Sequence, residues 1–130
     1  MVVIEYPEPY AIVKLDPSSQ IPQWVDESHF TSVTRTPEEL SIICLESRVP
    51  SMHKGETGWY LIRCEGPLSF DTTGILANLS QILNLEGLSI LAVATYNTDY
   101  ILTRSPEVAR NALQKAGYEV IRANSSETSS

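Results

Sequence analysis

An α+β fold built from two halves is predicted for this chain of 130 residues. Short apolar runs rich in β-branched and aromatic residues predict strands, and two stretches with helical periodicity both lie after residue 70. A glycine-containing segment at residues 53–58 separates the halves. We therefore expect an N-terminal half over residues 1–58, a C-terminal half over 59–122 and a disordered serine-rich tail over 123–130.

The C-terminal half reads as β-α-β-β-α-β, which is the order of a ferredoxin-like unit. Its first helix is expected to start at an N-cap, Thr73, and to end at Gly87. Its second helix has Ser105 as N-cap and Pro106 in its first turn, and it ends at Gly117. The expected buried faces are Ile75, Leu79 and Ile82, then Ala109, Ala112, Leu113 and Ala116. The expected strands are 59–64, 88–96, 100–103 and 118–121.

The N-terminal half is expected to be a thinner version of the same plan. Residues 1–9 contain Pro7 and Pro9 and are predicted to form an extended lead-in. Thr36 has the spacing of a capping box, with Pro37 and Glu39 after it, so one helical turn is expected there. The remaining expected elements are strands at 10–15, 30–35 and 41–45, and a short helix at 21–25.

The charge balance excludes several classes of partner. Nine Lys and Arg residues stand against sixteen Asp and Glu, which gives a net charge of −7. Binding to nucleic acid or to an anionic membrane surface requires clustered cations, so neither partner is expected. No signal peptide is visible before Lys14, and no apolar run reaches the roughly 20 residues that span a bilayer. We expect a cytoplasmic protein.

No catalytic or metal-binding constellation is visible in the sequence. His29 and His53 each lie in a polar segment without neighbouring ligands at metal-binding spacing. Cys44 and Cys64 both lie in predicted strands, where buried reduced thiols are expected. We therefore expect neither an enzyme nor a cofactor.

One edge of the C-terminal half could bind a ligand. In this topology the loop at residues 69–74 and the turn at 95–99 lie at the same end of the sheet. The loop leads into a helix whose free amides suit a carboxylate, while Asp71 and Asp99 suit an ammonium or guanidinium group. An anion site beside a cation site is what a free amino acid requires. Alternatively, Asp71 only caps the helix and Asp99 only fixes the hairpin.

Three segments carry a resemblance to a known family: SVTRTPEELSIIC at 32–44, GPLSFDTTGIL at 66–76 and ATYNTDYIL at 94–102. They resemble the tandem ACT-domain proteins, and in particular the CASTOR family of cytosolic arginine sensors in a short form with a single pair of modules. The resemblance covers about residues 10–121 and implies two tandem ACT modules of β-α-β-β-α-β order, the first abbreviated. It also implies a non-catalytic sensor that binds an amino acid between modules.

The resemblance carries a ligand site onto specific positions of this chain. Main-chain amides near Thr73 and Gly74 would hold the ligand carboxylate, Asp71 and Asp99 would take its positive groups, and a partner module would add backbone. Thr72 stands where the arginine sensors carry a glutamate, so the ligand is arginine or another amino acid. The alternative is a ligand-free ACT-type module for protein interaction or dimerisation. The implied site residues are Ser69, Asp71, Thr72, Thr73, Gly74, Leu76, Ser89, Ile90, Thr95, Tyr96 and Asp99.

A homodimer is expected from the distribution of charge. Residues 72–85 contain no charged residue, although a helix exposed to water usually carries Glu and Lys on its outer face. The strand expected at 88–96 is also uncharged and is apolar on both alternations. The first half of the chain could cover these surfaces, but a second copy related by a two-fold axis would cover them as well. It would also restore the four modules of the family.

Overall fold

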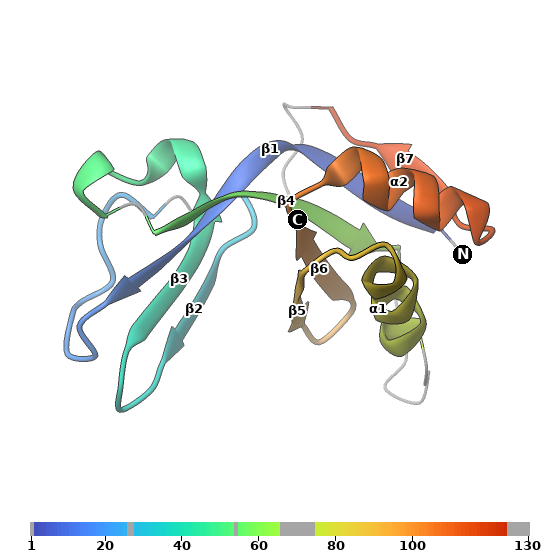
Figure 1. Ribbon diagram of the computed structural model, residues 1–130. Coiled ribbons are helices and arrows are strands. Elements are labelled where there is room, and N and C mark those ends of the chain that lie inside the picture. Colours follow the sequence, from blue (N-terminus) through green and yellow to red (C-terminus); the bar gives the residue numbers. More distant parts are fainter. Residues whose placement is uncertain (1, 26–27, 54, 66–74, 125–130) are drawn as a thin grey trace. The chain divides into compact units, whose positions relative to one another are not determined.

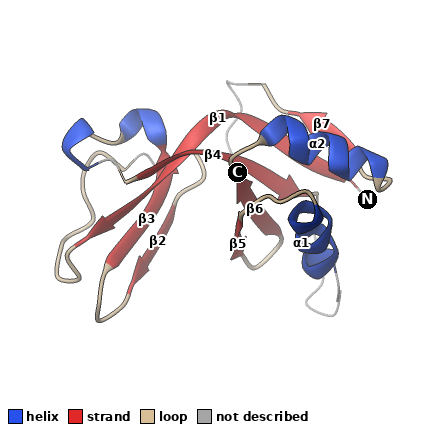
Figure 2. Cartoon of the chain, in the orientation of Figure 1, coloured by secondary structure: helices blue, strands red, loops and turns tan. Residues whose placement is uncertain are grey.

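The computed structural model describes residues 2–25, 28–53, 55–65 and 75–124, except for the side chain of residue 75. It is a mixed α/β fold in which strands predominate (Figures 1 and 2). The described residues divide into two compact units, one of residues 8–59 and one of residues 2–7 together with 60–124. None of the helices in the described part of the chain is long and apolar enough to cross a membrane.

The larger unit contains both α-helices and, after an additional first strand, has the β-α-β-β-α-β order that the sequence predicts. Its strands lie in the order β7–β1–β4–β6–β5. β7 is parallel to β1, and β6 is antiparallel to both β4 and β5. The elements in chain order are β1 (Val2–Leu15, of which residues 2–7 belong here), β4 (Glu56–Cys64, of which residues 60–64 belong here), α1 (Ile75–Leu85), β5 (Ile90–Ala94), β6 (Asp99–Thr103), α2 (Pro106–Lys115) and β7 (Glu119–Arg122).

Both helices pack on one face of this sheet. Leu79 and Leu83 of α1 and Leu113 of α2 are buried together with side chains from β1, β4 and β6. Each helix ends as predicted, at a glycine with a positive φ angle: Gly87 at 78° and Gly117 at 98°. One prediction on α2 is wrong: Ala116 is exposed, because it is the C-cap residue and no longer continues the buried stripe.

The N-terminal residues form a strand, which corrects the expected lead-in. β1 begins at Val2, and its first residues lie between β7 and β4. In a ferredoxin-like sheet, the last strand would pair with the first strand of the unit. Here β7 pairs with β1 and not with β4, the first strand of the predicted unit. In this pairing Val3 of β1 lies opposite Val120 and is fully buried in the core. Pro7 and Pro9 fall between the residues that pair with β7 and those that pair with β3, so the missing N–H groups interrupt neither ladder.

The strands of the smaller unit are a β-hairpin, the second half of β1 and the first residues of β4. Its strands β2 (Ser32–Arg35) and β3 (Leu40–Leu45) are antiparallel, and β3 pairs with Tyr10–Leu15. Its core contains Ala11, Val13, Leu40, Ile42, Cys44 and Val49. After β3 come two short 3-10 helices that the sequence did not indicate, η1 (Glu46–Arg48) and η2 (Ser51–His53). No α-helix occurs among the described residues of this unit.

Two helical predictions in this unit are wrong. Residues 21–25 form turns, closed by a bond from the Val25 amide to the Pro22 carbonyl of 3.3 Å. The segment at Thr36 is the tight turn between β2 and β3. The Thr36 hydroxyl still accepts the amides of Glu38 at 3.1 Å and Glu39 at 3.2 Å. The Thr36 amide, however, bonds to the Glu39 carbonyl at 2.9 Å, which closes a hairpin and leaves no helix to propagate.

Candidate functional site

About half of the predicted site residues lie in the described part of the chain. The loop residues Ser69, Asp71, Thr72, Thr73 and Gly74 lie outside the described residues. The positions that the structure describes are Leu76, Ser89, Ile90, Thr95, Tyr96 and Asp99. They belong to α1, to the start of β5, to the turn between β5 and β6 and to the start of β6.

The turn between β5 and β6 is held by its own threonines. The Thr95 amide donates to the Thr98 carbonyl at 2.9 Å, and the Thr95 hydroxyl donates to the same carbonyl at 2.8 Å. In return, the Thr98 amide donates to the Thr95 hydroxyl at 3.3 Å. Tyr96 lies in this turn and is 80 % exposed. Thr95 therefore shapes the turn, and most of the side chain of the next residue, Tyr96, is exposed to solvent.

The same turn is tied to the end of β4. The Thr98 hydroxyl donates a hydrogen bond to the Cys64 carbonyl. Cys64 is the last residue of β4, and residues 66–74 follow it before α1 begins. The turn therefore stands beside the point where the predicted ligand loop leaves the sheet. Thr98 was missed in the sequence, although the Thr-x-x-Thr spacing with Thr95 is typical of a side-chain-stabilised turn.

Asp99 places a negative charge at this edge. The β4–β6 register pairs Arg63 with Tyr100, so its continuation sets Cys64 opposite Asp99. Burial, and then the charge of Asp99, raises the pKa of the Cys64 thiol from 9.0 to about 11, so this thiol stays protonated at neutral pH. Asp99 is partly buried and forms no ion pair with any described residue.

The other described positions have structural contacts. Leu76 and Ile90 are partly buried and pack against the core between the helices and the sheet. Ser89 is exposed, and its carbonyl accepts a hydrogen bond of 3.4 Å from the buried Thr103 hydroxyl. Thus Thr95 and Tyr96 lie in the β5–β6 turn with Asp99 directly after it, whereas Leu76 and Ile90 each pack against the core.

Both cysteines are buried and free, as the sequence predicts. Within the described ranges, no group of three or more His, Cys, Asp or Glu side chains could hold a metal ion.

Comparison with family models identifies two regions. A model of the ACT domain matches residues 54–115, and a model of an N-terminal domain matches residues 8–52. ACT domains are generally regulatory modules that bind ligands, and they are not generally catalytic. Among curated proteins, none matches this chain significantly.

Two solved structures are similar over most of their length. Protein Atu0741 from Agobacterium tumefaciens is 35 % identical, with a TM-score of 0.86 over 94 % of this chain and 92 % of that chain. A protein of unknown function from Vibrio cholerae, VC0802, described as a possible transport protein, is 19 % identical, with a TM-score of 0.70 over 89 % of this chain and 87 % of that one. The second likeness shows the fold alone. The chain belongs to the same family as protein Atu0741, and its C-terminal region contains an ACT domain that follows a separate N-terminal domain.

Proposed function

We propose that this protein is a non-catalytic regulatory protein that binds a free amino acid at the edge formed by the β5–β6 turn and the end of β4. The observation that carries the proposal is Asp99, a partly buried carboxylate without an ion-pair partner among the described residues. It is the first residue of β6, directly after the turn that Thr98 ties to the last residue of β4. A carboxylate held in this way suits an ammonium or guanidinium group.

The opposite end of the ligand is assigned to the start of α1. This helix has eleven residues, and the first amides of a helix lack intrahelical partners, so they favour a carboxylate. In the proposal, the amides near Thr73 and Gly74 take the α-carboxylate, and Asp71 joins Asp99 in binding the positive groups. The sequence is the support for these loop residues, together with Ser69, Thr72 and the neighbouring Leu76.

The first prediction concerns the ligand. A melting scan against the twenty amino acids is expected to raise the Tm with at least one of them. An amino acid at about 100 times its Kd adds about 2.7 kcal/mol to the free energy of unfolding, which such a scan detects. The variant Asp99→Asn should then bind that amino acid roughly ten- to hundredfold more weakly, because a charged hydrogen bond is lost.

Glu86→Gln is the matched control, because Glu86 is an exposed acid just after α1. It removes the same charge and should bind with unchanged affinity. If no amino acid at millimolar concentration shifts the Tm, the proposal of an amino-acid site is contradicted and the alternative, a ligand-free interaction module, is favoured. Equal affinity of Asp99→Asn and the unmodified protein would place the site elsewhere.

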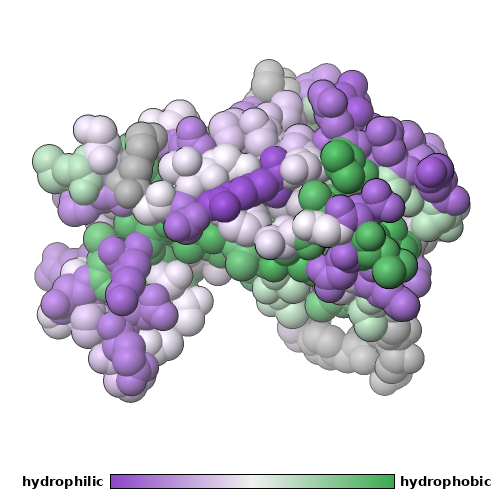
Figure 3. Space-filling model, viewed as in Figure 1, coloured by the Kyte–Doolittle hydropathy of each residue, from purple (hydrophilic) through white to green (hydrophobic). Residues whose placement is uncertain are grey.

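We further propose a homodimer, with the amino acid bound at or near the contact between the copies. β5 is the last strand of its sheet and pairs only with β6, so the outer backbone edge near Ser89 and Ile90 has no neighbouring strand within the described chain. The uncharged α1 exposes Ala77, Gln81, Asn84 and Leu85, the last at 78 %. Hydrophobic side chains reach the surface over α1 and α2 (Figure 3).

The second prediction follows from this surface. Light scattering at micromolar concentration should give the mass of a dimer, and Leu85→Glu should shift it toward the monomer, because a buried carboxylate at the contact would be unpaired. Ile121→Glu is the control: Ile121 is 44 % exposed on β7, the strand at the opposite edge of this sheet from β5. A monomeric mass with and without the amino acid would contradict the dimer and the shared site together.

A further inference from the structure

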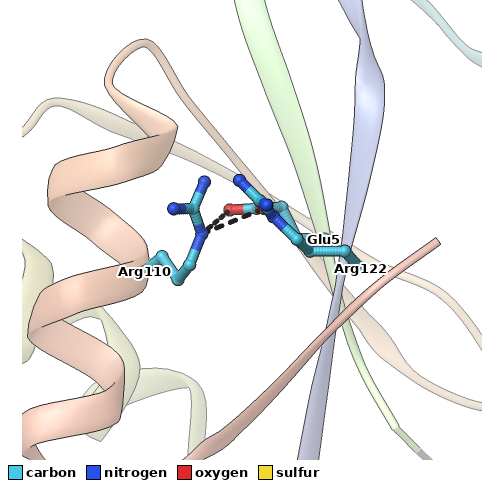
Figure 4. A network of polar contacts seen from close by, with 3 residues as sticks. All are labelled: Glu5, Arg110 and Arg122. Carbon is cyan, nitrogen blue, oxygen red and sulfur yellow. Dashed lines mark hydrogen bonds and ion pairs between the residues drawn. The ribbon is translucent and has the colours of Figure 1, made fainter.

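We propose a second ligand site, distinct from the amino-acid site, in which Arg110 and Arg122 bind the carboxylate or phosphate group of a small anion. Its centre is Glu5 on β1, which is only 6 % exposed although it is charged. The Arg110 Nε atom lies 3.2 and 3.3 Å from the two Glu5 carboxylate oxygens, and the Arg122 Nε atom lies 3.2 Å from Oε1 (Figure 4). Two guanidinium groups thus converge on one carboxylate.

These residues meet because of the sheet register. Val3 and Val120 are partners in the parallel β1–β7 pair and contribute to the core beneath the helices. Two residues further along, Glu5 is the partner of Arg122, and the side-chain period of two places both on the same face. Arg110 reaches Glu5 from α2. The polar cluster of Glu5, Arg110 and Arg122 therefore lies next to the hydrophobic core, near the first turns of α2.

A pocket of about 430 Å³ opens at this cluster. Its volume lies in the range of roughly 300–1,000 Å³ that small-molecule sites occupy. Proline and tyrosine side chains line it together with the charged groups, which is the usual combination of apolar walls and a few convergent polar groups. The lining residues are Glu5, Tyr6, Pro7, Tyr60, Pro106, Glu107, Arg110, Arg122 and Ala123.

The two arginines retain unused donors. Both reach Glu5 through Nε, and their terminal Nη atoms form no hydrogen bond with any described residue. A single arginine would neutralise Glu5, so the second leaves one positive charge beyond what Glu5 balances. Glu5 fixes both planar groups, whose remaining N–H donors match the geometry of a carboxylate or a phosphate. Glu107, the other acid of the pocket, is exposed.

The start of α2 adds to the attraction for an anion. Pro106 and Glu107, the first two residues of this ten-residue helix, line the pocket, and the Ser105 side chain makes no capping hydrogen bond. The first amides of α2 therefore carry partial positive charge at the same place as the arginines. The chain as a whole has a net charge of −7 and repels anions, so saturable binding of an anion requires a built site such as this one.

The experiment is a titration of the full chain with inorganic phosphate and, separately, malonate, at constant ionic strength set with chloride. Amide chemical shifts report the binding. Saturable changes in chemical shift are expected for amides at the start of α2 and in β7. The anion that saturates these changes at the lower concentration, phosphate or malonate, identifies which of the two groups the site prefers. Arg122→Met should weaken that binding roughly ten- to hundredfold. Arg122 is the more exposed arginine, at 65 %, so its removal should leave the fold intact.

Arg104→Met is the matched control, because Arg104 is exposed near the start of α2 but does not line the pocket. It should bind the anion as the unmodified protein does. Asp99→Asn should also leave anion binding unchanged, which separates this site from the amino-acid site. The proposal is overturned if neither anion gives saturable shifts, or if Arg104→Met and Arg122→Met weaken binding equally, since that would be a general charge effect.

Discussion

Leu83→Ala is expected to lower the free energy of unfolding by about 2–5 kcal/mol. Leu83 is fully buried in the core between the helices and the sheet, where Leu79, Ile62 and Ile101 are also buried. Truncation removes the transfer free energy of the lost methyl groups and leaves a cavity that two helices and a sheet cannot fully close. Urea unfolding followed by circular dichroism measures the change, with an unaltered slope if only the native state is affected.

The matched control for this variant is Val108→Ala on α2. Val108 is 41 % exposed, so shortening it should change the free energy of unfolding by no more than about 0.5 kcal/mol. A loss in Leu83→Ala that is no larger than the loss in Val108→Ala would mean that α1 does not pack on the sheet as described.

The helical half of the fold was predictable because its signals are local. In α1, the burial of Leu79 and Leu83 follows the helical period, and Gly87 ends the helix with bonds from its own amide and that of Leu88 back to Asn84 and Leu83. The second helix repeats this pattern before Gly117. The one wrong residue, Ala116, lies where periodicity continues in the sequence but the helix has already ended.

The place of β1 was not predictable from such signals. Its first residues pair with Glu119–Arg122, more than a hundred residues away in the chain, and no pattern within residues 2–7 shows that partner. Pro7 and Pro9 favoured a lead-in, because a proline normally interrupts a strand. They are tolerated because β1 changes partners between Glu5 and Tyr10.

The candidate sites show the same division between local and distant signals. The threonines of the β5–β6 turn and Asp99 directly after it stand out in the sequence, because the turn is short (residues 95–98) and topology places it beside the end of β4. The Glu5 cluster was missed. Glu5 interrupts an apolar run, which is a visible anomaly, but its partners Arg110 and Arg122 are 105 and 117 residues away.

Removal of the Glu5 carboxylate is the second change with a large expected effect on stability. Glu5→Ala should lower the free energy of unfolding by about 2–4 kcal/mol, because it deletes charge-assisted hydrogen bonds and leaves a guanidinium without its partner. Most of this loss arises at Arg110, whose side chain is 20 % exposed, since Arg122 at 65 % can return to water. Urea unfolding at neutral pH measures the difference.

Glu65→Ala is the control, because it breaks an ion pair of the same kind at the surface. Glu65 is 41 % exposed and lies 3.4 Å from the Arg63 guanidinium, so its loss should cost about 1 kcal/mol or less. The double variant Glu5→Leu/Arg110→Met should recover part of the stability lost in Glu5→Ala, because apolar side chains then fill the space and the less exposed of the two guanidinium groups, that of Arg110, is removed with its partner. If Glu5→Ala costs no more than Glu65→Ala, the cluster does not hold β1, α2 and β7 together, and the burial of Glu5 contributes nothing to the stability of this unit.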